Sequence, residues 1–400
     1  MNMIGKRIES LRKKSGMTQQ VLAEKLGVTD KAISKWEKGS GYPDLTMFPK
    51  LSSIFGVTID YLISGQKRGI AIAGNIITDI VKSLDAYPPI GMLSYVTAIT
   101  HAVGGCVPNT AIDLAKIDQT IPVYALGKVG MDENGRYIIS QLKKNGVVVD
   151  GISYSASNVT SSCDVMSVPA GERTFFHNKG ANKEFSPDDI DVDSLNCNIL
   201  HIGYLLLLDA FDESHKEYGT VMAEFLHRVQ KAGIKTSIDM VSDATVDYGE
   251  KIIPTLKYCD YVIVNEVECC KIWDIDAYKP NGELDYDNIK LCMERMRDCG
   301  VRDKIVVHSK KRSFLLNVKT DSFCEVPSLK IPGESIKGSV GAGDAFCAGC
   351  LYGIYNDYSD IEILDFASAA AACSLFAVNS TDGMKSKSEI LKLLENCERL

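Results

Sequence analysis

The chain has 400 residues and a net charge of −8, with 45% hydrophobic and 24% charged residues. These values are ordinary for soluble globular proteins and exclude fibrous and intrinsically disordered classes. A chain of this length is expected to form two or three domains, each with its own core.

Charge and cysteine are unevenly distributed along the chain. Residues 1–68 hold 12 Lys and Arg against 6 Asp and Glu, which leaves 32 basic and 46 acidic residues for the rest. A basic head on an acidic body indicates that only the head meets a polyanion such as DNA. All 13 cysteines follow residue 68 without a paired C-x-x-C framework, which is typical of reduced thiols. Because no segment has the pattern of a signal peptide or the ~20 apolar residues of a membrane span, we expect a cytoplasmic protein with no membrane partner.

Residues 1–66 are predicted to form a small all-α domain of five short helices. Apolar residues at helical spacing start at Ile4, and Thr18 and Thr29 have the residue type that caps the next two helices, which meet around a turn at Gly27. Two short helices around such a turn predict a helix-turn-helix. The apolar residues that we assign to the last three helices are Ala32, Ile33 and Trp36, then Leu45, Phe48, Leu51 and Phe55, then Ile59, Tyr61 and Leu62.

Residues 17–39, MTQQVLAEKLGVTDKAISKWEKG, resemble the helix-turn-helix of Cro and phage repressors, the XRE type. The resemblance implies that the third helix enters the major groove of double-stranded DNA and that the start of the second touches phosphate. Repressors of this type commonly bind paired half-sites, so we expect a homodimer on an operator. The alternative is a helical partner-binding module with merely solvated lysines. The residues expected to contact DNA are Gln19, Thr29, Lys31, Ser34 and Lys35.

In residues 69–400, apolar β-rich runs alternate with helical patterns. This alternation predicts an α/β fold with a mostly parallel sheet covered by helices on both faces. Ligands of such sheets bind beyond the carboxyl ends of the strands. We expect strands at residues 70–73, 121–125, 199–203, 236–239, 261–264 and 305–308, and helices that include 110–117 and 216–232.

The most informative segment is Gly-Ala-Gly-Asp-Ala-Phe at residues 341–346, a glycine-rich turn that opens a helix. The N–H groups of Gly341, Ala342 and Gly343 would point at one spot, where the helix dipole favours an anion. Asp344 could accept the proton of an attacking hydroxyl while these groups hold a transferring phosphoryl group. By itself, such a turn is also an ordinary tight connection.

Polar residues follow other predicted strands. Asp79 ends the segment GNIITD and Asn109 ends GGCVPN, and both can make the hydrogen bonds that a sugar requires. Turn and capping chemistry is the alternative for each. Asn265 and Glu268 follow the strand at residues 261–264, and their oxygens suit Mg²⁺ held mainly through water. For this pair the alternative is a capping box at a helix start.

Five motifs in order make residues 69–400 similar to the ribokinase-like, or PfkB, carbohydrate kinases. They are GNIITD, GGCVPN, GKVGMDENG at residues 127–135, NEVE and GAGDAF. The resemblance implies a Rossmann-like sheet with a small β lid, and transfer of phosphate from ATP to a sugar or nucleoside hydroxyl with Mg²⁺. It implies that Asp344 is the base, that residues 341–343 form the anion hole, and that Asn265 and Glu268 handle Mg²⁺ and phosphate. The implied substrate-binding residues are Asp79, Gly104, Gly105, Asn109 and Arg173.

Three departures from the family pattern concern the cation and the nucleotide. Gly338 stands where the family has an Asp that helps bind a monovalent cation, which puts potassium activation in doubt. The nucleotide loop, usually Thr-Leu-Gly-x-x-Gly, reads HSKKRS at residues 308–313, so Ser309 and Lys310 replace its usual contacts and its basic residues can attract phosphate. Ser368 replaces an Asn on the adenine side. These changes leave two hypotheses open: a sugar kinase fused to a DNA-binding head, and a sugar-sensing regulator with little or no activity.

Two other features carry no assigned chemistry. Cys347 and Cys350 form the one C-x-x-C, in the helix after Asp344, where we expect core packing and not redox or zinc chemistry. His177 and His308 lack further metal-type ligands at useful spacing and are expected to be structural or solvent-facing.

Overall fold

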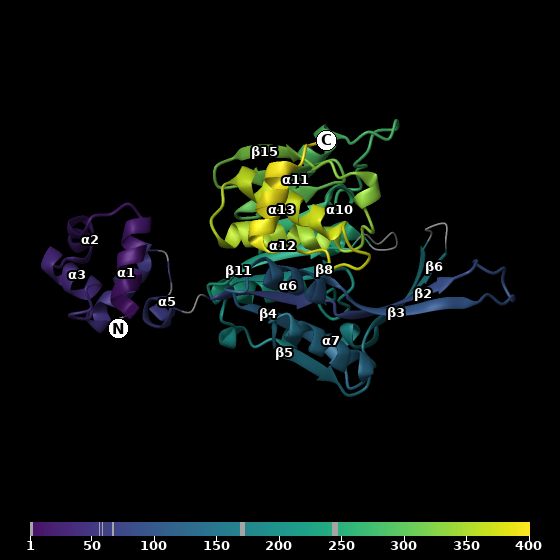
Figure 1. Cartoon of the computed structure of the whole chain (residues 1–400), viewed down its shortest axis with the longest axis horizontal. Helices are drawn as coiled ribbons and strands as arrows, with labels where there is room; N and C mark the ends of the chain where they lie inside the picture. Colours follow the sequence, from purple (N-terminus) through teal and green to yellow (C-terminus); the bar gives the residue numbers. More distant parts are fainter. Residues whose placement is uncertain (1–2, 56, 58, 66–67, 169–172, 242–246) are drawn as a thin grey trace. The chain divides into compact units, whose positions relative to one another are not determined.

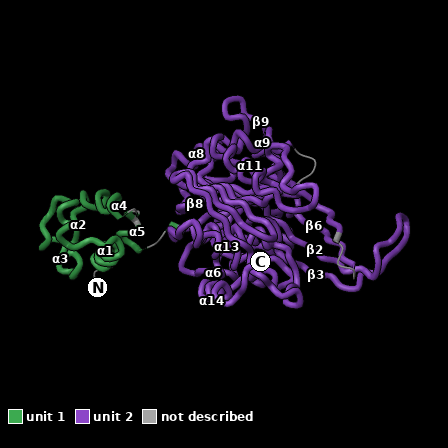
Figure 2. Tube along the Cα trace, turned by 90° about the horizontal axis from the view of Figure 1, so that it is seen from above, with its two compact units in different colours: residues 1–68 green, residues 69–400 purple. Residues whose placement is uncertain are grey.

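The computed structural model describes residues 3–55, 57, 59–65, 68–168, 173–241 and 247–400. The chain divides into two compact units, Met1–Arg68 and Gly69–Leu400 (Figure 2). No helix among the described residues is long and apolar enough to cross a membrane.

The first unit is a bundle of short α-helices around one core, as predicted. Thr18 caps α2 by accepting a hydrogen bond from the Val21 N–H at 3.2 Å, and Thr29 caps α3 in the same way. Gly27 ends α2 in the left-handed conformation, with φ 72°. The prediction that Leu45 belongs to this core is wrong, because Leu45 lies in a 3-10 turn and is 80% exposed. The helices are α1 Met3–Lys14, α2 Gln19–Leu26, α3 Asp30–Glu37, α4 Phe48–Phe55 and α5 Ile59–Ser64.

The second unit is built on a nine-stranded sheet in the order β15-β14-β13-β12-β11-β8-β1-β4-β5. The strands from β5 to β13 pair in parallel, and β14 and β15 add an antiparallel edge, so the predicted mostly parallel sheet is confirmed. The strands are β1 Gly69–Gly74, β4 Val123–Gly130, β5 Val148–Ser155, β8 Cys197–Leu205, β11 Lys235–Met240, β12 Tyr261–Asn265, β13 Lys304–His308, β14 Arg312–Asn317 and β15 Ser322–Pro327.

Helices cover both faces of this sheet and form two separate cores (Figure 1). The central strand β1 divides its side chains between them: Ile70 and Ile72 enter one core, and Ala71 and Ala73 enter the other, as the alternation of a strand requires. The first core contains residues of α6 Cys106–Ile117, α7 Glu133–Lys144, α12 Ala342–Tyr355, α13 Asp360–Ser374 and α14 Lys387–Asn396. The second contains residues of α8 Val221–Lys231, α9 Tyr248–Leu256, α10 Glu266–Lys271 and α11 Tyr286–Asp298.

The helix predicted at residues 216–232 starts too early, because its first turn is not helical in the structure. Residues there form a short hairpin, β9 Ser214–His215 with β10 Gly219–Thr220, and α8 starts only after it. Gly219 has φ 85°, which a helix excludes, and the Thr220 hydroxyl caps α8 by accepting from the Ala223 N–H at 3.1 Å.

A second, smaller sheet of four strands in the order β3-β2-β6-β7 forms the lid. Figure 1 shows β2, β3 and β6 extending away from the body of the unit. The outer part of β3 is exposed, whereas its end at residues 103–104 is buried beside the start of α6. The strands are β2 Ile77–Leu84, β3 Val96–Gly104, β6 Ser162–Ser167 and β7 Arg173–Asn178.

Candidate active site

The glycine-rich turn at residues 341–343 is fixed by close packing. Gly341 has φ 79°, and a Cβ there would lie 2.4 Å from Cβ of Ser380, so both the conformation and the space require glycine. The turn leads into α12, a helix of 14 residues whose first N–H groups have no partner within the helix. Gly341, Ala342 and Gly343 line a cavity of about 310 Å³ together with Asp344. This helix N-terminus is therefore the expected place for an anion.

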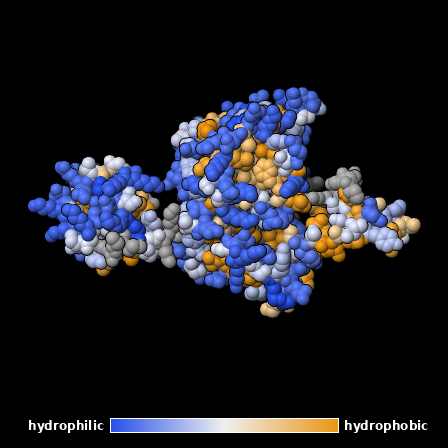
Figure 3. Space-filling view, viewed as in Figure 1, coloured by the Kyte–Doolittle hydropathy of each residue, from blue (hydrophilic) through white to orange (hydrophobic). Residues whose placement is uncertain are grey.

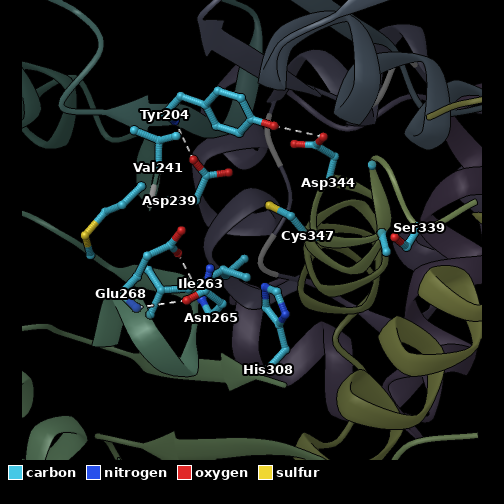
Figure 4. A pocket seen from close by; sticks show the side chains of 15 residues that line it. Tyr204, Asp239, Val241, Ile263, Asn265, Glu268, His308, Ser339, Asp344 and Cys347 are labelled. Carbon is cyan, nitrogen blue, oxygen red and sulfur yellow. Dashed lines mark hydrogen bonds between the residues drawn. The ribbon is translucent and has the colours of Figure 1, made fainter. Parts of the chain in front are cut away.

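Asp344 is buried at this N-terminus, with 5% of its surface exposed. Its Oδ2 accepts a hydrogen bond from the Asn109 amide at 2.9 Å. It also accepts one from the Tyr204 hydroxyl at 3.1 Å (Figure 4). Burial raises the pKa of Asp344 to about 7, and the nearby Asp239 carboxylate acts in the same direction, whereas the two hydrogen bonds act against it. A carboxyl with this pKa is suited to accept a proton near neutral pH.

Asn109 lies on α6, and its amide group bridges two neighbours. Its Nδ2 donates to Asp344 and its Oδ1 accepts from the Ser380 hydroxyl at 2.7 Å. The family resemblance implies that this side chain faces the sugar. In the structure it holds the carboxyl of Asp344 in place, and only 4% of its surface is exposed.

Asp79 lies on the lid strand β2, where the missing side chain of Gly104 makes room for it. A Cβ at Gly104 would lie 2.4 Å from Oδ2 of Asp79, and a Cβ at Gly105 would lie 2.5 Å from the Asn75 carbonyl oxygen. Burial raises the pKa of Asp79 to about 6, and its charge contributes to the raised pKa of Asp344. The predicted residue Arg173 begins β7, but its side chain lies outside the described part of the chain.

Asn265 and Glu268 form the capping box that was the alternative to a metal site. Oδ1 of Asn265 accepts from the Glu268 N–H at 2.8 Å, and Oε2 of Glu268 accepts from the Asn265 N–H at 3.0 Å. Both residues also line the cavity of Asp344. The capping box therefore fixes a carboxylate and an amide at the cavity wall.

A second cavity of about 560 Å³ adjoins the first and shares His308, Ala342 and Gly343 with it. It is lined by Ser309, Lys310 and Ser368, the three residues predicted on the nucleotide side. The other lining residues that matter for its character are Leu329, Ile336, Phe346, Ala371, Ala372 and Leu375. A largely apolar pocket beside a helix N-terminus suits a base attached to phosphates.

His308, for which the sequence predicts a structural or solvent-facing role, lies where the two cavities meet. Its ring centroid is 4.7 Å from that of Phe346, and burial lowers its pKa to about 4, so the imidazole is neutral. Gly338 packs against the chain as well, because a Cβ there would lie 2.9 Å from the Ala377 carbonyl oxygen. Gly338, which stands where the family has a cation-binding Asp, is thus closely packed against a neighbouring segment of the chain.

Tyr204 and Asp239 are two site residues that sequence reasoning missed. Tyr204 ends its strand region with φ 59°, and its N–H donates to Oδ1 of Asp239 at 2.5 Å (Figure 4). Tyr204 directly follows the predicted strand at residues 199–203, and Asp239 is the last residue of the predicted strand at 236–239. Ligands bind at the carboxyl ends of strands in such sheets, and this rule could have identified both residues.

The predicted DNA-binding residues lie on α2, α3 and the turn between them. Lys31 and Lys35 are exposed on α3, and Ser34 is half-buried beside them. The Thr29 hydroxyl caps α3. The Gln19 amide donates to the Glu37 carboxylate at 2.7 Å, and Glu37 in turn pairs with Arg12, which fixes the start of α2.

A Rossmann-like sheet, a lid, and a buried carboxyl at an anion-binding helix N-terminus define a phosphotransferase for a small hydroxyl-bearing substrate. The sequence profile of the pfkB family carbohydrate kinases matches residues 68–387, and that of a helix-turn-helix domain matches residues 8–62. The chain therefore belongs to the pfkB family of carbohydrate kinases, and it carries a helix-turn-helix domain at residues 8–62.

Individual relatives agree with both assignments. The 5-dehydro-2-deoxygluconokinase of Geobacillus kaustophilus is 22% identical over 321 residues, which cover 74% of this chain and 85% of the relative. The solved Arabidopsis thaliana ribokinase, complexed with ribose and ATP, superimposes with a TM-score of 0.68 at 22% identity and covers 82% of this chain and 99% of its own. The HTH-type transcriptional activator BcrR of Enterococcus faecalis is 46% identical over 61 residues, which are 15% of this chain and 30% of that protein.

Proposed function

We propose that residues 69–400 transfer the γ-phosphate of ATP to a hydroxyl of a sugar or nucleoside, with Asp344 as the general base. The observation that carries the proposal is the buried carboxyl of Asp344, with a pKa of about 7, beside the N-terminus of α12. The Arabidopsis ribokinase with the same fold was solved with ribose and ATP.

In the proposed reaction, the acceptor hydroxyl loses its proton to Asp344 as its oxygen attacks the γ-phosphorus. The bond from that phosphorus to the bridging oxygen of ADP breaks, and the N–H groups at residues 341–343 stabilise the transferring group. The amide of Asn109 and the hydroxyl of Tyr204 hold the carboxyl in position. Most of the rate enhancement comes from the positioning of the two reactants and from charge stabilisation.

The two sides of the site take different parts of the reactants. Asp79, with the backbone at Gly104 and Gly105, binds the acceptor, and Arg173 is the further acceptor-binding residue that the family resemblance implies. Ser309, Lys310 and Ser368 bind the nucleotide. An amide and a carboxylate at the cavity wall, Asn265 and Glu268, fit Mg²⁺ that keeps several of its waters. When bound with ATP, Mg²⁺ neutralises phosphate charge.

The test starts with the unidentified acceptor. A thermal-shift screen of sugars and nucleosides, with ATP and Mg²⁺, identifies compounds that stabilise the native state. ADP formation with the best compound is then compared between the wild type and Asp344→Asn. We expect the variant to bind the acceptor and to lose phosphoryl transfer by about 10²–10⁴-fold or more. Full activity in the variant would overturn the mechanism.

The second candidate is a sugar-sensing regulator with little catalytic activity. It is favoured by the loss of both loop glycines at residues 308–313 and by Gly338 in place of an Asp. Ligand stabilisation without ADP formation in the screen would favour this candidate over the kinase. Retention of Asp344 and the glycine turn supports the kinase.

We further propose that residues 1–66 bind an operator in double-stranded DNA, with Lys31, Ser34 and Lys35 reading bases and Gln19 and Thr29 at the backbone. If the sugar alters DNA affinity, linkage requires that DNA alter sugar affinity by the same factor. Operator titrations by fluorescence anisotropy, with and without sugar and ATP, measure this factor. Equal operator affinities in all conditions would show that the two domains are uncoupled.

We propose a homodimer, because helix-turn-helix domains of this type read two half-sites. A second copy of the lid would cover its apolar face, part of which is visible in Figure 3. Light scattering at micromolar concentration should give twice the chain mass of 43.8 kDa, and a monomer mass would contradict the proposal. The large apolar residues exposed on and beside the lid strands are Tyr87, Ile90, Met92, Leu93, Tyr95, Val96, Ile99, Val159, Phe175 and Phe176.

A further inference from the structure

Three side chains with different metal-binding atoms meet beneath the active-site cavity. His201 comes from β8, Asp239 from the adjacent parallel strand β11, and Cys347 from α12, one turn after Asp344. They are 0%, 7% and 2% exposed. Nε2 of His201 lies 3.2 Å from Oδ2 of Asp239 and 3.5 Å from Sγ of Cys347, and the three ligand atoms lie within 4.8 Å of one another.

The geometry does not fit a catalytic triad. In a triad, the acid and the nucleophile contact opposite nitrogens of the imidazole. Here the carboxylate and the thiol both approach Nε2, whereas Nδ1 lies 2.9 Å from the Ser237 hydroxyl. One N–H on Nε2 can satisfy only one of the two groups. A cation at their common point would satisfy all three.

The donor types and the two separations measured from His201 Nε2 match a transition metal such as zinc. Ligand bonds of about 2.0–2.3 Å at a tetrahedral angle place neighbouring ligand atoms about 3.4–3.6 Å apart. A nitrogen, an oxygen and a sulfur donor suit zinc, whereas Mg²⁺ requires oxygen ligands. The site is thus chemically distinct from the oxygen donors of Asn265 and Glu268.

The surrounding groups orient the ligands as metal sites require. The Ser237 hydroxyl faces the second ring nitrogen of His201. The Tyr204 N–H donates to Oδ1 of Asp239, which leaves Oδ2 directed at the imidazole. Such second contacts fix the ring and the carboxylate of metal ligands. Ser237 and Tyr204 lie on the same two strands as the ligands Asp239 and His201, so the fold itself positions these contacts.

We propose that His201, Asp239 and Cys347 bind one zinc-class transition-metal ion through Nε2, Oδ2 and Sγ, with a fourth position open to the cavity of Asp344. Asp239 and Cys347 line that cavity with Asp344 (Figure 4). Binding takes Cys347 as the thiolate, and its proton passes to solvent. The fourth ligand of such an ion would project into the cavity that the reactants need, so we expect metal binding to inhibit phosphoryl transfer.

The binding test uses Co²⁺ as a spectroscopic probe on the reduced, chelator-treated full chain. We expect a thiolate-to-cobalt absorption band that saturates at one Co²⁺ per chain and is displaced by Zn²⁺. Cys347→Ser and His201→Asn should lose the band. Cys350→Ser, which changes a buried thiol on the same helix, should retain it. A wild type without the band, or a Cys347→Ser protein that keeps it, overturns the proposal.

A measurement on the wild type alone covers the case in which the variants do not fold. X-ray absorption of the protein with one Zn²⁺ per chain should give one sulfur among the ligands. Two or more sulfurs, or none, would overturn the proposal; three would place the ion at the neighbouring thiols of Cys269, Cys270 and Cys292. Because neither experiment depends on turnover, its outcome is separate from that of the kinase proposal.

Inhibition is tested under saturating Mg²⁺ and ATP. Micromolar Zn²⁺ should lower the wild-type rate, and a zinc-selective chelator should restore it. The Cys350→Ser protein should respond like the wild type. Binding without inhibition would overturn the placement of the open position toward the cavity.

Discussion

The hydroxyl of Tyr204 offers a direct test of how the acidity of Asp344 is set. Its hydrogen bond to Oδ2 stabilises the carboxylate and lowers the pKa that burial and Asp239 raise. Tyr204→Phe removes this bond and keeps the ring. A hydrogen bond to a charged group contributes about 1.5–3 kcal/mol, and 1.36 kcal/mol corresponds to one pKa unit, so the smaller value raises the pKa of Asp344 from about 7 to about 8.

The sign of the effect follows from the role of Asp344 as a base. Only the carboxylate accepts a proton, so activity rises with pH through the pKa, and a raised pKa moves the acidic limb of the profile to higher pH. At pH 7 the ionised fraction falls from about a half to about a tenth, which lowers kcat/KM about fivefold. At pH 9 the two proteins should differ little.

The assay is ADP formation at low acceptor concentration between pH 5.5 and pH 9, since kcat/KM reports ionisations of the free enzyme. Tyr352→Phe is the matched control, because it removes a phenol from the same helix as Asp344, with its own hydroxyl 3.5 Å from Asp118. The control should keep the wild-type midpoint. An unchanged midpoint in Tyr204→Phe, with the rate lowered equally at every pH, would refute the reasoning.

Three further predictions concern the other contacts. Lys35→Ala should weaken operator binding by about 1–3 kcal/mol in anisotropy titrations. Lys13→Ala, which removes an exposed lysine of α1, should leave operator binding unchanged. Equal losses in the two variants would show that the contact of Lys35 is nonspecific. Glu268→Gln keeps an oxygen for the helix cap but loses the negative charge, so the Mg²⁺ concentration that gives the half-maximal rate should rise. An unchanged Mg²⁺ titration would show that Glu268 only caps the helix. Lys310→Ala should raise the KM for ATP several-fold without changing that for the acceptor, because it removes a positive charge from the cavity that we propose for the nucleotide. Equal changes in both KM values would contradict the proposed place of Lys310 on the nucleotide side.

The sequence predicts those parts of the molecule whose signals are local. The helix-turn-helix rests on caps and glycine turns within a few residues, and the anion site rests on the turn directly before Asp344. The lid was expected only from the family resemblance. Its strands have mixed burial, and the outer part of β3 is exposed, so they lack a continuous apolar run.

Features formed by distant segments gave no such signal. Asn109 and Asp344 are 235 residues apart in the chain, and only the packing of α6 on α12 joins them. Cys347 was expected to be an ordinary core residue, and it is buried, but nothing in the spacing of the chain placed His201 and Asp239 beside it. The capping box at Asn265 shows a different limit of prediction from sequence. The same local pattern forms both a helix start and part of the cavity wall, so the pattern alone does not separate the two roles.

The junction of β3 and α6 has a mechanical consequence. The lid strand ends at Gly104 and the helix that carries Asn109 begins at Cys106, so Gly105 is the whole connection. That residue has φ 84°, and a Cβ there would lie 2.5 Å from the Asn75 carbonyl oxygen, so the connection is short and closely packed. We therefore expect a displacement of the lid to move Asn109 and, through it, the carboxyl of Asp344. A small alcohol or water that cannot draw the lid shut would meet a misaligned base, and this linkage would protect ATP from wasteful hydrolysis.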